Sequence, residues 1–203
     1  MPEETCTTLV MRPYGSQSVL ESNNIKYRNY AHELLTQLES LAAEVQENWP
    51  KSVESITDKN LYPELWKLVG IRDRTSDSVR IYAALAVEGF LNFYGVLRLG
   101  QNIYDDHFEK LGLITKLRKL ILISENIVIS QKDPLVKILE SIASDRNSLV
   151  HPKVREYSNK SERSSIEIPG IAKNAVTNME AFFEQFTRIV PLMKHHINPR
   201  QIG

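Results

Sequence analysis

The stretch DPLVKILESIASDRNSLVHP, residues 133–152, is predicted to form one helix with both ends marked by residue type. Asp133 can cap the first turn with its carboxylate, and Pro134 suits the first helical position. Pro152 disfavours helical geometry at the residue before it, so the helix is expected to end at His151. Its apolar residues recur at helical spacing and form one stripe: Leu135, Ile138, Leu139, Ile142 and Leu149.

That stripe has a gap at Arg146, four residues after Ile142, where another apolar residue would be expected. A cation that faces a core is costly unless it is paired or lines a cavity. Asn147 and His151 follow Arg146 on the same segment, so the three side chains are a candidate functional group. A structural role stays open, because Arg and His near a helix C-terminus also complement the helix dipole.

A second segment, residues 74–100, contains the run IYAALAVEGFLNFYGVL, which is apolar nearly all round. This pattern is typical of a central helix that is covered on most sides. Glu88 and Asn92 lie one turn apart in it and share a face. A carboxylate in such surroundings needs a partner, and Arg146 is the obvious one, whether the pair is functional or only structural. Polar residues interrupt the run, so we do not expect a membrane span.

The rest of the chain predicts further helices and short loops. The expected helical ranges are 23–49, 63–69, 113–126 and 169–197, and residues 101–112 are expected to form a short helix or turn. The polar side of 113–126 carries Lys116, Arg118 and Lys119, for which a solvated face is favoured over an RNA contact. The predicted fold class is all-α, an up-and-down bundle of about five main helices. Residues 1–22 are expected to form an irregular or partly extended N-terminal arm, 23–197 one helical domain, and 198–203 a C-terminal tail.

Composition narrows the class of protein. The 203 residues carry a formal net charge of zero, which argues against a protein whose whole surface is basic and binds nucleic acid. Cys6 is the single cysteine, so no disulfide can form within the chain, and this fits a reducing compartment. The N-terminus lacks a secretory pattern, and we expect a cytoplasmic protein.

Other site chemistry is scarce in the sequence. No Gly-rich phosphate loop and no Cys/His metal spacing is present, so no cofactor and no metal are expected. After His151 comes a polar, mildly basic segment in which Lys153, Arg155 and Lys160 are candidate RNA contacts.

Two segments together resemble the HEPN-domain superfamily. DRNSLVHP resembles its signature, an Arg with a polar residue beside it, a few mostly apolar residues, then a His at a helix end. AALAVEGFLN resembles an earlier helix of the same superfamily, where a Glu in an Ala/Leu-rich run is followed by Leu-Asn. The resemblance covers residues 24–197 as architecture, but its specific motifs cover only these two segments. No particular subfamily is indicated.

The resemblance implies an all-helical bundle and, for many members, a metal-independent endoribonuclease that acts as a dimer. Carried over by residue, it makes Arg146 and His151 the catalytic pair, Asn147 a supporting residue, and Glu88 the buried carboxylate that steadies the Arg. It further implies a toxin or phage-defence role, with an antitoxin such as a nucleotidyltransferase as partner. Other members have lost catalysis, so a HEPN protein that binds a nucleotide, RNA or a protein remains the alternative. A plain helical interaction module is a third interpretation.

Overall fold

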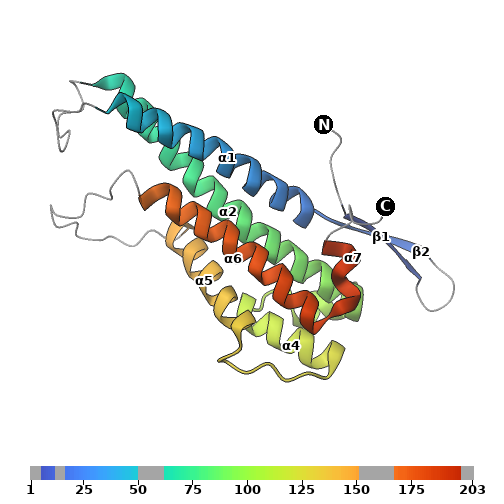
Figure 1. The fold of residues 1–203 in the computed structure, drawn as a ribbon. Coiled ribbons are helices and arrows are strands. Elements are labelled where there is room, and N and C mark those ends of the chain that lie inside the picture. The colour runs from blue at the N-terminus through green and yellow to red at the C-terminus, as the bar shows by residue number, and fades with distance from the viewer. Residues whose placement is uncertain (1–5, 12–16, 50–61, 151–166, 198–203) are drawn as a thin grey trace.

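The fold is built on a pair of long antiparallel helices that lie side by side (Figure 1). They are α1 (Asn24–Asn48) and α2 (Pro63–Leu99). The computed structural model describes residues 6–11, 17–49, 62–150 and 167–197. Ala31, Leu38 and Val45 of α1 are fully buried at a spacing of seven residues. Such a spacing keeps one seam of a helix facing its neighbour over several turns.

The remaining helices pack against α2 and complete an all-α bundle, as the sequence predicts (Figure 1). They are α3 (Gln101–His107), α4 (Leu113–Glu125), α5 (Pro134–Val150) and α6 (Glu167–Ile189), followed by a 3₁₀ turn (Pro191–Met193) and α7 (Lys194–Ile197). At the start of α5, the Asp133 carboxylate accepts a hydrogen bond from the Leu135 N–H at 2.9 Å. The predicted cap of this helix is therefore confirmed. Among the described residues, no helix is long and apolar enough to cross a membrane.

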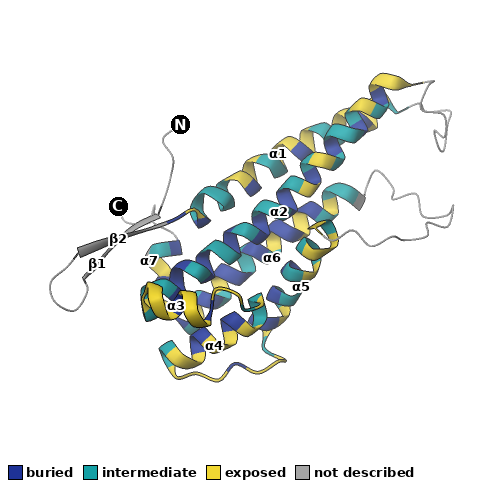
Figure 2. Cartoon of the chain, turned by 180° about the vertical axis from the view of Figure 1, so that it is seen from behind, coloured by how far each residue is buried: buried dark blue, intermediate teal, exposed yellow. Residues whose placement is uncertain are grey.

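Helix α2 is the centre of the bundle, and Figure 2 shows buried residues along most of its length. Its aromatic core joins it to α6, because Phe90 packs edge-to-face on Phe183 and Phe186 at ring separations of 5.4 and 5.0 Å. The prediction of a helix covered on most sides is confirmed. The predicted break between 63–69 and 74–100 is wrong, since α2 is continuous. A single Gly70 costs only about 1 kcal/mol in a helix, which packing against α1 can offset.

The short helix or turn expected over 101–112 is confirmed, since α3 ends at His107 and a turn follows it. One other predicted boundary is wrong. The helix expected over 169–197 stops at Ile189, ahead of Pro191, which has no N–H to continue the helical hydrogen bonds.

The described part of the N-terminal arm is extended and paired. Strands β1 (Cys6–Met11) and β2 (Gln17–Ser22) form an antiparallel hairpin in which Leu9 is opposite Val19. The arm is therefore more regular than expected. Residues 198–203, the predicted tail, lie outside the described residues.

Gly95 of α2 allows the close approach of α3. A Cβ added at Gly95 would lie 2.4 Å from Cδ2 of Tyr104. Gly95→Ala is therefore expected to lower the free energy of unfolding by about 1–3 kcal/mol in urea titrations. Gly89→Ala is the matched control in the same helix, because its nearest contact would be an ordinary 3.8 Å, to Asn24. A Gly95→Ala protein as stable as the Gly89→Ala protein would contradict this packing.

Glu180 of α6 ties α6 to α1 through charge. Its carboxylate accepts hydrogen bonds from Arg28, with Nε at 2.7 Å, and lies 2.8 Å from Nε2 of His32. Burial alone would raise the Glu180 pKa, but the hydrogen bonds from Arg28 and His32 outweigh it and the pKa is lowered from 4.5. The ionised Glu180 carboxylate therefore stabilises the folded state at pH values above its ordinary pKa. This contribution to the free energy of unfolding is lost as the pH falls through the lower pKa of the folded state.

Glu180→Gln is accordingly expected to destabilise the protein near neutral pH. The loss relative to wild type should shrink as the pH drops below 4.5, in urea unfolding measured across the acid range. The control is Glu184→Gln on the same helix, whose partner Arg188 is exposed. A Glu180→Gln deficit that is the same at all pH values would exclude this electrostatic origin.

Candidate functional site

The packing of α5 on α2 brings together the two charges singled out in the sequence. Nη2 of Arg146 lies 3.6 Å from Oε2 of Glu88. The predicted contact between these residues is therefore confirmed. The expected deep burial is wrong, because the Arg146 and Glu88 side chains are 41% and 29% exposed. Glu88 anchors the guanidinium from one side, and the exposed part of the guanidinium can still reach a ligand.

Asn92, one turn after Glu88, is engaged with α3 and α4. Its side-chain oxygen accepts hydrogen bonds from the Tyr104 hydroxyl at 2.6 Å and from Nζ of Lys116 at 2.8 Å. Lys116 also donates to the Glu109 carbonyl oxygen at 3.1 Å. Asn92 thus supports the packing around Glu88 through α3 and α4.

Lys116 is buried, with 2% exposure, so its predicted place on a solvated face is wrong. Burial lowers the Lys116 pKa, while the charges of Glu88 and Glu109 oppose that shift. Burial and the nearby carboxylates Glu109 and Glu88 raise the pKa of Tyr104 to about 12. The region behind Glu88 is therefore a buried polar network in which Lys116 partly balances the acidic charge.

The other predicted site residues are less constrained. Asn147 is exposed and forms no side-chain hydrogen bond with the described residues. The candidate catalytic His151 and the candidate RNA contacts Lys153, Arg155 and Lys160 lie outside the described residues. Their roles stay predictions.

A deeper ion pair lies beside Arg146, between Arg80 of α2 and Asp145 of α5. Nε of Arg80 donates to both carboxylate oxygens of Asp145, at 2.9 and 3.1 Å, and Nη2 donates to the same group. Arg80 also contacts Asp77 and Ser148, each at 3.1 Å. Burial would lower the Arg80 pKa, but the hydrogen bond and charge of Asp145, with those of Asp77, raise it.

Sequence reasoning missed the Arg80–Asp145 pair. The signal was present, since Arg80 stands directly before the apolar run of α2, and Asp145 follows the buried Ile142 by three residues. Either position could have been recognised as a charge directed toward the core.

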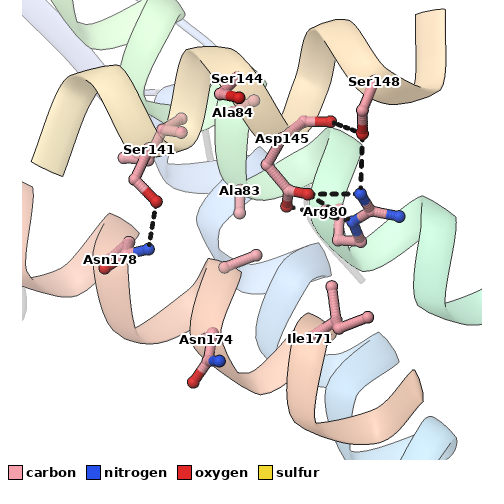
Figure 3. Close-up of a pocket in the computed structure, with 12 residues that line it drawn as sticks. Arg80, Ala83, Ala84, Ser141, Ser144, Asp145, Ser148, Ile171, Asn174 and Asn178 are labelled. Atoms are coloured by element: carbon pink, nitrogen blue, oxygen red, sulfur yellow. Dashed lines mark hydrogen bonds and ion pairs between the residues drawn. The ribbon is translucent and has the colours of Figure 1, made fainter. Parts of the chain in front are cut away.

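A pocket of about 350 Å³ adjoins this ion pair, between α2, α5 and α6 (Figure 3). Its α5 wall carries Ser141, Ser144, Asp145 and Ser148, and its α6 wall carries Asn174 and Asn178. Arg80 also lines it, and the rest of the lining is apolar and mostly small: Ala83, Ala84, Ile142, Ile171 and Ala175. Arg146 is not among the lining residues. The pocket and the Glu88–Arg146 contact therefore involve different side chains of the same segment of α5.

Within the part of the chain that the structure describes, no three His, Cys, Asp or Glu side chains gather in a way that could hold a metal ion. Comparison with protein-family models, curated proteins and solved structures finds no match to this chain.

Proposed function

We propose that this chain is a metal-independent endoribonuclease of the HEPN type, acting in the cytoplasm as a toxin or phage-defence effector. The contact between Glu88 and Arg146 is the observation that carries the proposal. The two residues come from the two segments that resemble the superfamily, and they meet with the Arg146 guanidinium partly exposed. A guanidinium held on one side by a carboxylate and open on the other suits the binding of a phosphate group.

The proposed reaction is attack of a ribose 2′-OH on the adjacent phosphorus. One His151 accepts the 2′-OH proton, and the P–O5′ bond breaks as the 5′-oxygen receives a proton from a second acid. The products are a 2′,3′-cyclic phosphate and a 5′-hydroxyl. Arg146 stabilises the negative charge that builds on the phosphoryl oxygens. Asn147, exposed one turn before His151 in the sequence, supports the ring or donates to phosphate.

The proposal includes a homodimer, because one chain supplies a single such His. A two-fold pair built around the C-terminal end of α5 would let the partner subunit's His151 act as the acid for His151 of the first chain. An antitoxin protein, such as a nucleotidyltransferase, is the proposed regulatory partner.

The direct test is cleavage of single-stranded RNA by the purified protein in the presence of EDTA. Chromatography and end-labelling should detect 2′,3′-cyclic phosphate and 5′-hydroxyl ends, and light scattering should detect a dimer at micromolar concentration. Cleavage that appears only on addition of magnesium would refute the mechanism.

The second candidate function is a non-catalytic HEPN protein that binds a nucleotide, RNA or a protein partner. The zero net charge favours it, because RNA enzymes commonly present a basic surface. Binding of RNA without cleavage of any RNA, by wild type, would select this alternative.

A further inference from the structure

The pocket between α2, α5 and α6 has the size of a small-ligand site. Small side chains from all three helices, among them Ala83, Ala84 and Ser144, leave its volume of about 350 Å³ open. This volume is near the lower end of the range of ligand pockets. It therefore suits a single compact, ring-sized group.

The positive charge at the pocket is already paired with carboxylates. Arg80 is the cation that lines it, and its donors are directed to Asp145, Asp77 and Ser148. The two carboxylates together carry one negative charge more than the guanidinium offsets, and the Asp145 side chain is itself 27% exposed. This excess disfavours an anionic phosphate or carboxylate, so the ligand chemistry that fits the pocket carries no negative charge.

The hydrogen-bonding groups that remain are amides and hydroxyls. Nδ2 of Asn178 donates to Oγ of Ser141 at 3.2 Å, which leaves the Asn178 oxygen as an acceptor (Figure 3). Asn174 and Ser144 are exposed lining residues that form no side-chain hydrogen bond with the described residues, so amide and hydroxyl donors and acceptors lie at the edge of the pocket beside an apolar wall. Carboxamides beside an apolar surface complement the edge of a nucleobase, which alternates donors and acceptors around a planar ring.

The pocket also lies close to the proposed reaction site. Ser141 and Ser148 line it over about 10 Å of the α5 axis, and Arg146 lies within that span. RNA recognition commonly uses unstacked bases of single strands, inserted into protein pockets. A strand with a phosphate at Arg146 could place a neighbouring base on the α6 side of α5.

We propose that the α2–α5–α6 pocket binds one unstacked base of a single-stranded RNA and sets the base preference of the protein. This inference rests on the proposed ribonuclease function. The inference identifies one RNA base as the part of the substrate that the protein recognises. Asn174 and Asn178 are the residues that form hydrogen bonds with that base. Arg80 and Asp145 hold the wall of the pocket and are not readers.

The test is binding of short fluorescent RNAs to the His151→Ala protein, which allows equilibrium measurement without cleavage. Each RNA carries one of the four bases, or an abasic residue, at a single position in an otherwise constant strand. One base is expected to bind about tenfold or more tightly than the abasic strand, the size of a good amide–base contact. Asn174→Ala with Asn178→Ala should reduce that preference to nearly none.

Two further variants sharpen the result. Thr177→Ala is the matched control, an exposed polar residue of the same helix whose hydroxyl bonds to the Lys173 carbonyl oxygen; the base preference should persist. Ser144→Phe should fill the pocket. The variant protein should then bind all four base-containing strands with the affinity that it has for the abasic strand. Unfolding curves of each variant show that the fold is kept.

The outcomes separate this inference from the proposed function. An RNase that cuts with no base preference, or a preference that survives the asparagine double variant, would overturn the base pocket while leaving the ribonuclease in place. Base-selective binding by a wild-type protein that never cuts would keep the pocket and remove the enzyme. Free nucleosides that bind as tightly as the strands would show that the ligand is a nucleoside and overturn the RNA assignment.

Discussion

Replacing His151 by alanine is expected to lower the rate of RNA cleavage by about 10²- to 10⁴-fold, the usual contribution of a general acid or base. In the proposed dimer both proton transfers use this residue, so the upper part of that range is expected. The measurement is single-turnover cleavage in EDTA with saturating protein. The unfolding midpoint in urea serves as the control for folding. A His151→Ala protein that cuts as fast as wild type would place the site elsewhere or assign the activity to a contaminant.

Arg146→Ala is the companion variant, and the partial exposure of Arg146 determines its expected effects on cleavage and on stability. Cleavage should fall by about 10²- to 10³-fold, as for loss of one group that stabilises transition-state charge. Stability should fall by less than about 1 kcal/mol, because the Glu88–Arg146 pair is partly exposed. Arg188→Ala, an exposed arginine of α6, is the matched control and should leave cleavage unchanged. A large loss of stability in Arg146→Ala would make Arg146 a structural residue.

Replacing Arg80 by methionine is expected to lower the free energy of unfolding by about 1–3 kcal/mol, as for a partly buried charged group that loses its hydrogen-bond donors. Arg80 is 8% exposed, and its removal leaves the Asp145 carboxylate without the donors that now satisfy it. Urea unfolding measures the change. The control is Arg118→Met, an exposed arginine of α4 whose loss should cost far less.

A double variant tests the origin of that loss. Arg80→Met with Asp145→Leu should recover much of the stability, because an apolar pair of similar volume avoids burying an unpaired charge. If the double variant is less stable than Arg80→Met alone, the loss at Arg80 comes from packing and not from the unpaired carboxylate.

Much of the architecture was determined by local sequence. The helical spacing of apolar residues, the Asp133 cap and the apolar run of α2 each depend on near neighbours in the chain, so they can be recognised without a structure. The Glu88–Arg146 contact could also be predicted, because two charges in otherwise apolar stripes need compensation.

Only the tertiary structure decided how deeply each charge is buried. Adjacent helical residues differ by about 100° in direction, so a small rotation of α5 against α2 determines whether Asp145 or Arg146 faces the interior. The packing directs Asp145 to the buried Arg80, and the longer Arg146 reaches Glu88 while keeping part of its head in solvent. Lys116 is likewise buried by packing, because α4 places it against Asn92 of α2 and the Tyr104 ring of α3. The pocket, too, exists only where small residues of three helices meet, a coincidence in space that no single stretch of the chain contains.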